Sequence, residues 1–117
     1  YLVTFSSEYA DQVEVAINEH MKESTRAEIT KASLDNQGLI IVCPSLPAAL
    51  ETVNVIAPEH LELHVSNAME LLGSIRHAGA IFMGEWTPEA VGDYVAGPNH
   101  TLPTGGTARF SSPPLLL

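Results

Sequence analysis

The sequence has few basic side chains, a single cysteine and no long apolar run, and each of these shortages narrows the possible function. Five Lys and Arg residues stand against 14 Asp and Glu residues, which gives a formal net charge of −9. Because clustered Lys and Arg side chains are what neutralise phosphates, this balance argues against nucleic acid or an anionic membrane as a partner. The acidity itself selects no partner, since ordinary solubility explains it equally well.

The lone cysteine, Cys43, excludes an intramolecular disulfide and is consistent with a reducing compartment. It ends an apolar segment, so we expect an inert buried thiol rather than a nucleophile. No stretch approaches the ~20 apolar residues of a membrane-spanning helix, and no signal peptide is visible. We therefore expect a cytoplasmic protein. The chain begins at Tyr1 rather than at a methionine, and we interpret it as a processed or truncated piece of a longer chain.

Length and hydrophobic content predict one folded domain at most. The 117 residues are 45% apolar and 16% charged, which is enough apolar material for a real core. Helical patterns alternate with short apolar segments that we predict to be strands, at residues 2–5, 39–43, 61–65 and 80–83. This alternation is typical of an α/β fold with a mainly parallel sheet and flanking helices. Four strands are too few for a complete doubly wound domain, so we expect a partial Rossmann-like half-domain over residues 1–117.

Local signals predict where helices begin and how one strand is covered. Ser6 and Ser7 are candidate N-caps of the first helix, and residues 25–28 (TRAE) fit a capping box for a second helix. Thr87 is a candidate N-cap with a proline at the first helical position. The strand at 39–43 is apolar throughout, as expected when both faces of a strand are covered.

Polar, titratable residues fall in irregular segments of the second half, where a catalytic or metal site would need them. Glu59 and His60 come directly after Pro58. An imidazole can take a proton near neutral pH, and a neighbouring carboxylate can orient it or activate a water. The alternative is that Glu59 is a solvated loop residue and His60 a packed, hydrogen-bonded side chain. His64, four residues beyond His60, makes a zinc pair conceivable, but the HExxH arrangement is absent and the alternation favours a strand.

Asp93 and His100 lie in a Gly- and Pro-rich segment further along the chain. A carboxylate at position 93 is either a hard oxygen ligand for a metal or a helix-capping group. Two glycines at 105–106 would let the backbone approach a phosphate. Neither GxGxxG nor GxxxxGK[ST] occurs, however, so the sequence gives little support for a dinucleotide or P-loop site within this chain.

Three blocks of sequence, taken together, resemble the central signature of the histidinol dehydrogenase family. They are residues 56–62 (IAPEHLE), 79–84 (GAIFMG) and 92–104 (GDYVAGPNHTLPT), and their order and spacing match as well. The resemblance implies an NAD-dependent alcohol and aldehyde dehydrogenase. Such an enzyme oxidises L-histidinol to L-histidine through histidinal, in the last steps of histidine biosynthesis. The resemblance also implies zinc at an active site shared between the two subunits of a homodimer.

Residue by residue, the resemblance implies a catalytic acid–base pair, Glu59 and His60. His60 would bind the substrate and take a proton as each hydride leaves, and Glu59 would activate the water that attacks the aldehyde. Asp93 matches a zinc ligand that also lies against the substrate, and His100 would have a supporting role. The other zinc ligands, a Gln and two His, and the NAD-binding residues would lie outside this chain.

We therefore expect this chain to be a fragment of the enzyme that has no catalytic activity of its own. Two other interpretations stay open: a non-catalytic, structural or partner-binding half-domain, and a divergent relative that oxidises another small amino alcohol. The apolar end of the chain, residues 111–117, has no clear place in the family pattern.

Overall fold

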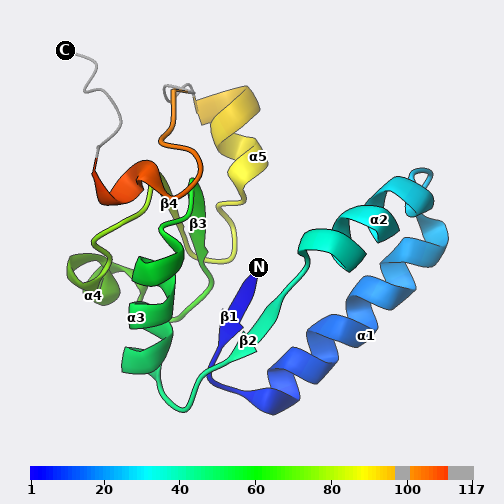
Figure 1. Cartoon of the computed structure of the whole chain (residues 1–117), viewed down its shortest axis with the longest axis horizontal. Helices are drawn as coiled ribbons and strands as arrows, with labels where there is room; N and C mark the ends of the chain where they lie inside the picture. The colour runs from blue at the N-terminus through cyan, green and yellow to red at the C-terminus, as the bar shows by residue number, and fades with distance from the viewer. Residues whose placement is uncertain (97–100, 111–117) are drawn as a thin grey trace. The chain divides into compact units, whose positions relative to one another are not determined.

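The computed structural model describes residues 1–96 and 101–110, except for the side chains of Asp93 and Ala96. The chain divides into two compact units, Tyr1–Ala49 and Leu50–Leu117. The described residues confirm the α/β class and the parallel strands. Those strands form two separate two-stranded pairs (Figure 1), where the sequence alone predicted a single sheet. The single half-domain over residues 1–117 stays a prediction.

The first unit is a strand–helix–helix–strand unit. Strands β1 (Leu2–Thr4) and β2 (Ile40–Val42) pair in parallel, and the connection between them consists of α1 (Ser7–Glu23) and α2 (Ala27–Gln37). In Figure 1 these two helices run beside each other. Strands and helices therefore occur in the predicted order, with boundaries shifted by a few residues.

The two helix starts of the first unit have different outcomes. Ser6 caps α1 as predicted, because its hydroxyl accepts a hydrogen bond from the Tyr9 N–H at 3.1 Å. The capping box predicted at residues 25–28 is wrong. The N-cap of α2 is Arg26, which makes no side-chain capping bond, and its own N–H donates to the Ser24 hydroxyl at 3.2 Å. Ser24, one position before the predicted cap Thr25, thus accepts the backbone hydrogen bond at the start of α2.

The exposure of β2 contradicts the prediction that residues 39–43 are covered on both faces. Leu39 and Val42 are each 50% exposed. A strand is apolar on both sides when layers of structure cover both faces of its sheet, and the first unit supplies only part of such a covering. Cys43, directly after β2, is buried as expected.

The second unit places the segments that resemble the family signature. Strand β3 (His60–Leu63) pairs in parallel with β4 (Ala80–Met83), so that His60 lies opposite Ala80. The preceding helix α3 (Leu46–Ile56) crosses the boundary between the units. The remaining elements are α4 (Ala68–Leu71), the 3₁₀ turns η1 (Leu72–Ser74) and η3 (Thr107–Arg109), α5 (Glu89–Val91) and the π-helical turn η2 (Gly92–Ala96).

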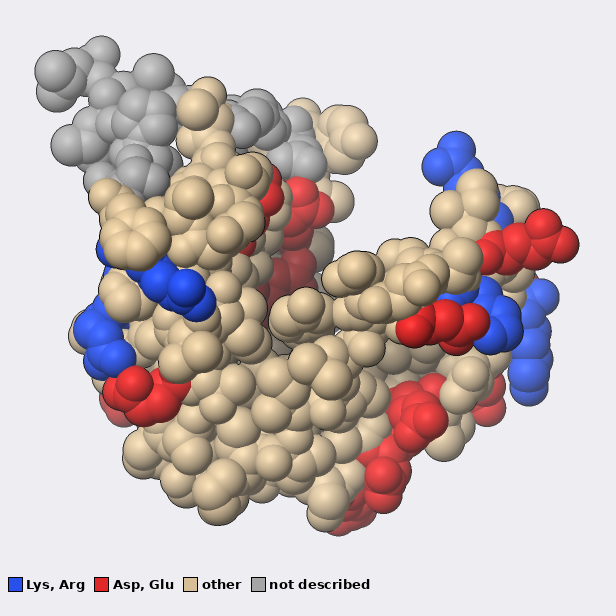
Figure 2. Space-filling view, viewed as in Figure 1, with Lys and Arg blue, Asp and Glu red and all other residues tan. Residues whose placement is uncertain are grey.

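Basic and acidic side chains share the surface of the first unit. On the face shown in Figure 2, the Lys and Arg side chains of the first unit are interspersed with acidic ones. No helix among the described residues is long and apolar enough to cross a membrane.

Candidate active site

The Glu59–His60 pair is reached through a strained turn at the end of α3. Ala57 closes the helix, because its N–H donates to the Val53 carbonyl at 2.9 Å. Its φ angle is 51°, and the residue is completely buried (0% exposed). Non-glycine residues in the left-handed region are uncommon and cluster at functional sites, where the surrounding structure holds them. The turn directs the chain from α3 into Pro58 and the start of β3.

A glycine directly before the neighbouring strand β4 fixes the backbone of Glu59. The Pro58 and Glu59 carbonyls accept hydrogen bonds from the N–H groups of Gly79 at 2.9 Å and Ala80 at 2.8 Å. A Cβ at position 79 would lie 2.5 Å from the Glu59 carbonyl oxygen and 2.9 Å from Cδ of Pro103. Only glycine permits so close an approach. The GAIFMG block therefore has a local physical reason to begin with glycine.

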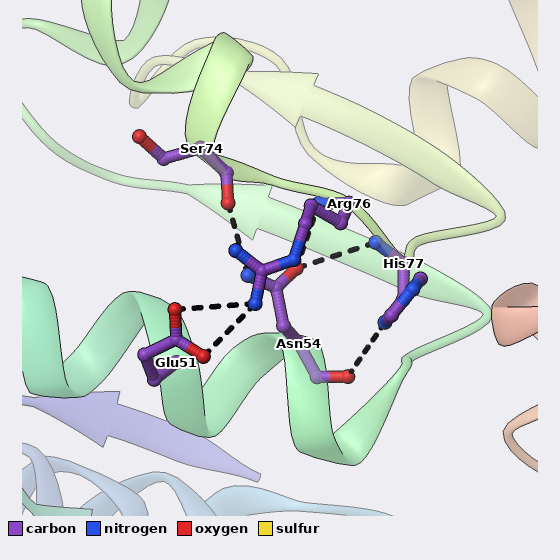
Figure 3. A network of polar contacts seen from close by, with 5 residues as sticks. All are labelled: Glu51, Asn54, Ser74, Arg76 and His77. Carbon is purple, nitrogen blue, oxygen red and sulfur yellow. Dashed lines mark hydrogen bonds and ion pairs between the residues drawn. The ribbon is translucent and has the colours of Figure 1, made fainter.

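A buried amide connects α3 to the segment that enters β4. Asn54 is 3% exposed, and its Nδ2 donates to the Ser74 carbonyl at 2.9 Å. Its Oδ1 accepts hydrogen bonds from the N–H groups of Arg76 at 2.7 Å and His77 at 3.3 Å. On the surface above, the Arg76 guanidinium contacts both carboxylate oxygens of Glu51, at 3.1 and 2.9 Å. Figure 3 shows these five residues converging on the end of α3.

Two side chains contact backbone carbonyls in the last turn of α3. Such carbonyls have no hydrogen-bond partner within the helix itself. His77 Nδ1 lies 3.2 Å from the Asn54 carbonyl oxygen, and Arg109 donates to the Val55 carbonyl. The cationic guanidinium also suits the negative end of the helix dipole. These residues line a surface depression of about 330 Å³. We interpret the residues that line this depression as structural, because their contacts hold the end of α3 in place.

His60 is the first residue of β3 and lies near a carboxylate from α5. Its Nε2 is 3.8 Å from Oε1 of Glu89, and the two side chains are 31% and 37% exposed. The imidazole also lies against Phe82 of β4, with ring centroids 6.0 Å apart and planes inclined by 36°. The ring is thus supported from one side and still accessible. Glu59 is half-buried beside it.

A second carboxylate, Glu62, lies two residues beyond His60 on β3. Its Oε1 accepts a hydrogen bond from the Glu89 N–H at 2.8 Å, and its Oε2 lies 3.1 Å from Nε2 of His64. His60 and His64 therefore contact different carboxylates. Among the described residues, no group of three or more His, Cys, Asp or Glu side chains is placed to hold a metal ion. The structure gives no support to a zinc pair made of these two histidines.

The structure describes the other two predicted site residues, Asp93 and His100, only in part. The backbone of Asp93 lies in η2, directly after α5, and its side chain is not described. Single π-helical turns occur frequently at functional sites. His100 and the apolar end at 111–117 lie outside the described residues.

Sequence reasoning missed three residues that the structure connects to this site: Asn54, Glu62 and Glu89. The available signal for Asn54 was a lone amide between two valines, Val53 and Val55. Glu62 belongs to the predicted strand at 61–65 and to the IAPEHLE block, and neither pattern indicates a capping role. Glu89 was read only as the second residue of a helix capped by Thr87. That cap prediction is wrong, because the N-cap is Pro88 and the Glu89 N–H bonds to Glu62 instead.

Comparison with known proteins gives one consistent family. The family model described as histidinol dehydrogenase matches residues 1–116. Histidinol dehydrogenase from Bacillus subtilis is 53% identical over 95% of this chain, and the one from Caldanaerobacter subterraneus is 54% identical over 96%. A crystal structure of histidinol dehydrogenase from Elizabethkingia anophelis superposes with a TM-score of 0.87 and 33% identity over 92% of this chain. The chain spans 26% of the length of both sequence relatives and 25% of the crystallised chain.

Proposed function

Because the chain belongs to the histidinol dehydrogenase family, we propose that it works as a segment of an enzyme that oxidises L-histidinol to L-histidine through histidinal. The reaction would take place in histidine biosynthesis, with NAD as the hydride acceptor. The observation that carries the proposal is the fixed backbone at Glu59 and His60, where the left-handed turn at Ala57 and the close contact with Gly79 converge. We also propose a cytoplasmic homodimer as the complete assembly.

In this proposal His60 is the base of both oxidation steps. A hydride can leave an alcohol carbon only if the hydroxyl proton is removed as well, and a histidine suits that transfer near neutral pH. The packing of its ring against Phe82 limits its orientations, while 31% exposure leaves room for a substrate. The carboxylate of Glu89 faces the positive charge that the ring gains when it takes the proton.

Glu59 has a separate task, because the second oxidation needs a water added to the aldehyde. A carboxylate beside the base can take a proton from that water as it attacks. Glu59 is half-buried, and its backbone is held by Ala80. Two adjacent residues would thus divide the proton transfers: His60 at the carbon being oxidised and Glu59 at the water. His60 and Asp93 would also bind the substrate, and His100 would support it.

Zinc belongs to the proposal only through Asp93. Four-coordinate zinc needs three or four protein ligands, and the described residues bring together no group of that size. The described site alone therefore does not fit a zinc ion, and we derive no step through one. We propose that Asp93 supplies one ligand to a site whose other ligands, like the NAD-binding residues, come from other parts of the full-length enzyme.

This chain alone should therefore neither hold zinc nor turn over histidinol. The test compares the chain with a protein of the relatives' full length that contains it, measuring zinc content and histidinol-dependent NADH formation on both. Zinc and activity in the longer protein only would support the proposal. Activity in the chain by itself would contradict the shared site, and activity in neither would contradict the proposed reaction.

A further inference from the structure

Helix α5 is capped by a residue from another element. The first N–H groups of a helix have no partner within it, and the N-cap of α5, Pro88, makes no side-chain capping bond. The N–H of Glu89, the first helical residue, donates to Oε1 of Glu62 at 2.8 Å. The start of α5 is thereby fixed to β3.

A contact in the reverse direction joins the same two elements. The Glu89 side chain extends back to β3, where its Oε1 lies 3.8 Å from Nε2 of His60. His60 and Glu62 are two residues apart on β3, and side chains at that spacing lie on the same face of a strand. Each element thus supplies one carboxylate to the other.

We propose that Glu62 and Glu89 form a carboxylate clasp that positions His60 relative to the segment following α5. Glu62 is the residue that positions Glu89, and Glu89 in turn faces His60. This inference rests on the proposed function, in which His60 is the base. Glu62 itself touches no reacting atom, so its role is positioning.

The position of α5 in the chain explains what the clasp would do. The helix ends at Val91 and continues directly into η2, whose backbone carries Asp93. Since α5 is only three residues long, its own hydrogen bonds fix its direction poorly. The clasp holds the start of this short helix against the strand that carries His60. It therefore sets the spacing between the two backbone segments that bear the proposed base and the proposed ligand.

The two histidines of this segment lie beside the two carboxylates of the clasp. His64 lies 3.1 Å from the second oxygen of Glu62, and His60 lies beside Glu89. An imidazole therefore flanks each carboxylate, which offsets the repulsion between the two acids when the rings are protonated. The capping bond itself needs only an acceptor oxygen at position 62 and no negative charge. A substitution that keeps the oxygen but removes the charge therefore distinguishes the capping role of Glu62 from a purely electrostatic one.

The test uses the full-length enzyme with Glu62→Ala, Glu62→Gln and the control Glu70→Ala. Glu70 is an exposed glutamate of α4 whose carboxylate accepts a hydrogen bond from the Asn67 side-chain amide at 3.2 Å. Misplacing a reacting group by about 1 Å costs about 100-fold in rate. We expect Glu62→Ala to lower kcat by about 10- to 100-fold, as supporting residues around active sites do. The KM for NAD should stay unchanged. Glu62→Gln, which keeps an acceptor oxygen, should retain most of the wild-type kcat, as should Glu70→Ala.

Each result decides between the alternatives. A wild-type kcat in Glu62→Ala, or an equal loss in Glu62→Ala and Glu62→Gln, would overturn the positioning role. If Glu62→Ala does not fold, Glu89→Ala serves as the second variant. It keeps the backbone N–H that Glu62 caps and removes the side chain beside His60. We expect kcat to fall while the far-ultraviolet circular dichroism stays unchanged; an unchanged kcat would overturn the clasp. No histidinol oxidation by the wild-type enzyme would instead refute the proposed function.

Discussion

Replacing Asn54 with alanine should destabilise this chain more than any exposed polar substitution. The amide is 3% exposed and serves three backbone groups: the Ser74 carbonyl and the N–H groups of Arg76 and His77. These groups lie 20 to 23 residues away in sequence. Without the amide, the segment that enters β4 loses its attachment to α3.

The size of the effect follows from the groups left without a partner. A buried polar group that loses its hydrogen bond costs about 1–3 kcal/mol. Ser74 and Arg76 are exposed residues, so water replaces part of the loss, and we take the lower end for each of the three groups. The expected change in the free energy of unfolding is about 3 kcal/mol, a large share of the ~5–15 kcal/mol typical of a domain.

Urea unfolding followed by circular dichroism measures this change. Fluorescence is a poor probe, because the single tryptophan, Trp86, is 87% exposed. The matched control is Asn36→Ala, which removes an exposed amide that donates to the Ala32 carbonyl at 2.7 Å. The control should change the free energy of unfolding by less than about 0.5 kcal/mol. If Asn54→Ala is as mild as the control, Asn54 does not hold α3 to the β4 segment.

Substitutions at three further positions test the same region, each by the same urea titration. Gly79→Ala places a Cβ 2.5 Å from a backbone oxygen and should cost about 1–3 kcal/mol, whereas Gly73→Ala, whose Cβ meets nothing within 4 Å, should not destabilise. Ala57→Gly should be near neutral, since relief of about 1–2 kcal/mol of left-handed strain is offset by a more flexible unfolded chain. Ala57→Val, at a completely buried position, should destabilise. Glu51→Gln breaks an exposed pair with Arg76 and should cost less than about 1 kcal/mol, an effect that salt removes; a larger, salt-independent loss would show that the pair is more than a surface contact.

Much of the fold follows from local sequence patterns. The apolar runs that became β2 and β4 and the Ser6 cap each depend on residues close together in the chain, which is why they could be predicted. Boundaries were less accurate. The predicted strand 61–65 is observed as His60–Leu63, because its limits depend on pairing with β4 rather than on its own alternation.

The features that could not be predicted depend on residues far apart in the sequence. The Glu89 N–H is capped by Glu62, 27 positions earlier, so the local pattern at Thr87 and Pro88 pointed to the wrong cap. The need for glycine at position 79 comes from the Glu59 carbonyl. The candidate pair at Glu59 and His60 was visible as a sequence motif, whereas its supports were visible only in three dimensions.

The central claim is that Glu59 and His60 divide the proton transfers of a two-step oxidation. It is tested most directly by the amount of NADH formed per histidinol consumed in the full-length enzyme and in its Glu59→Gln and His60→Asn variants. The account predicts two NADH per histidinol for the wild type, only the first oxidation for Glu59→Gln, and no turnover for His60→Asn, with folding unchanged. Wild-type stoichiometry and rate in His60→Asn would contradict it.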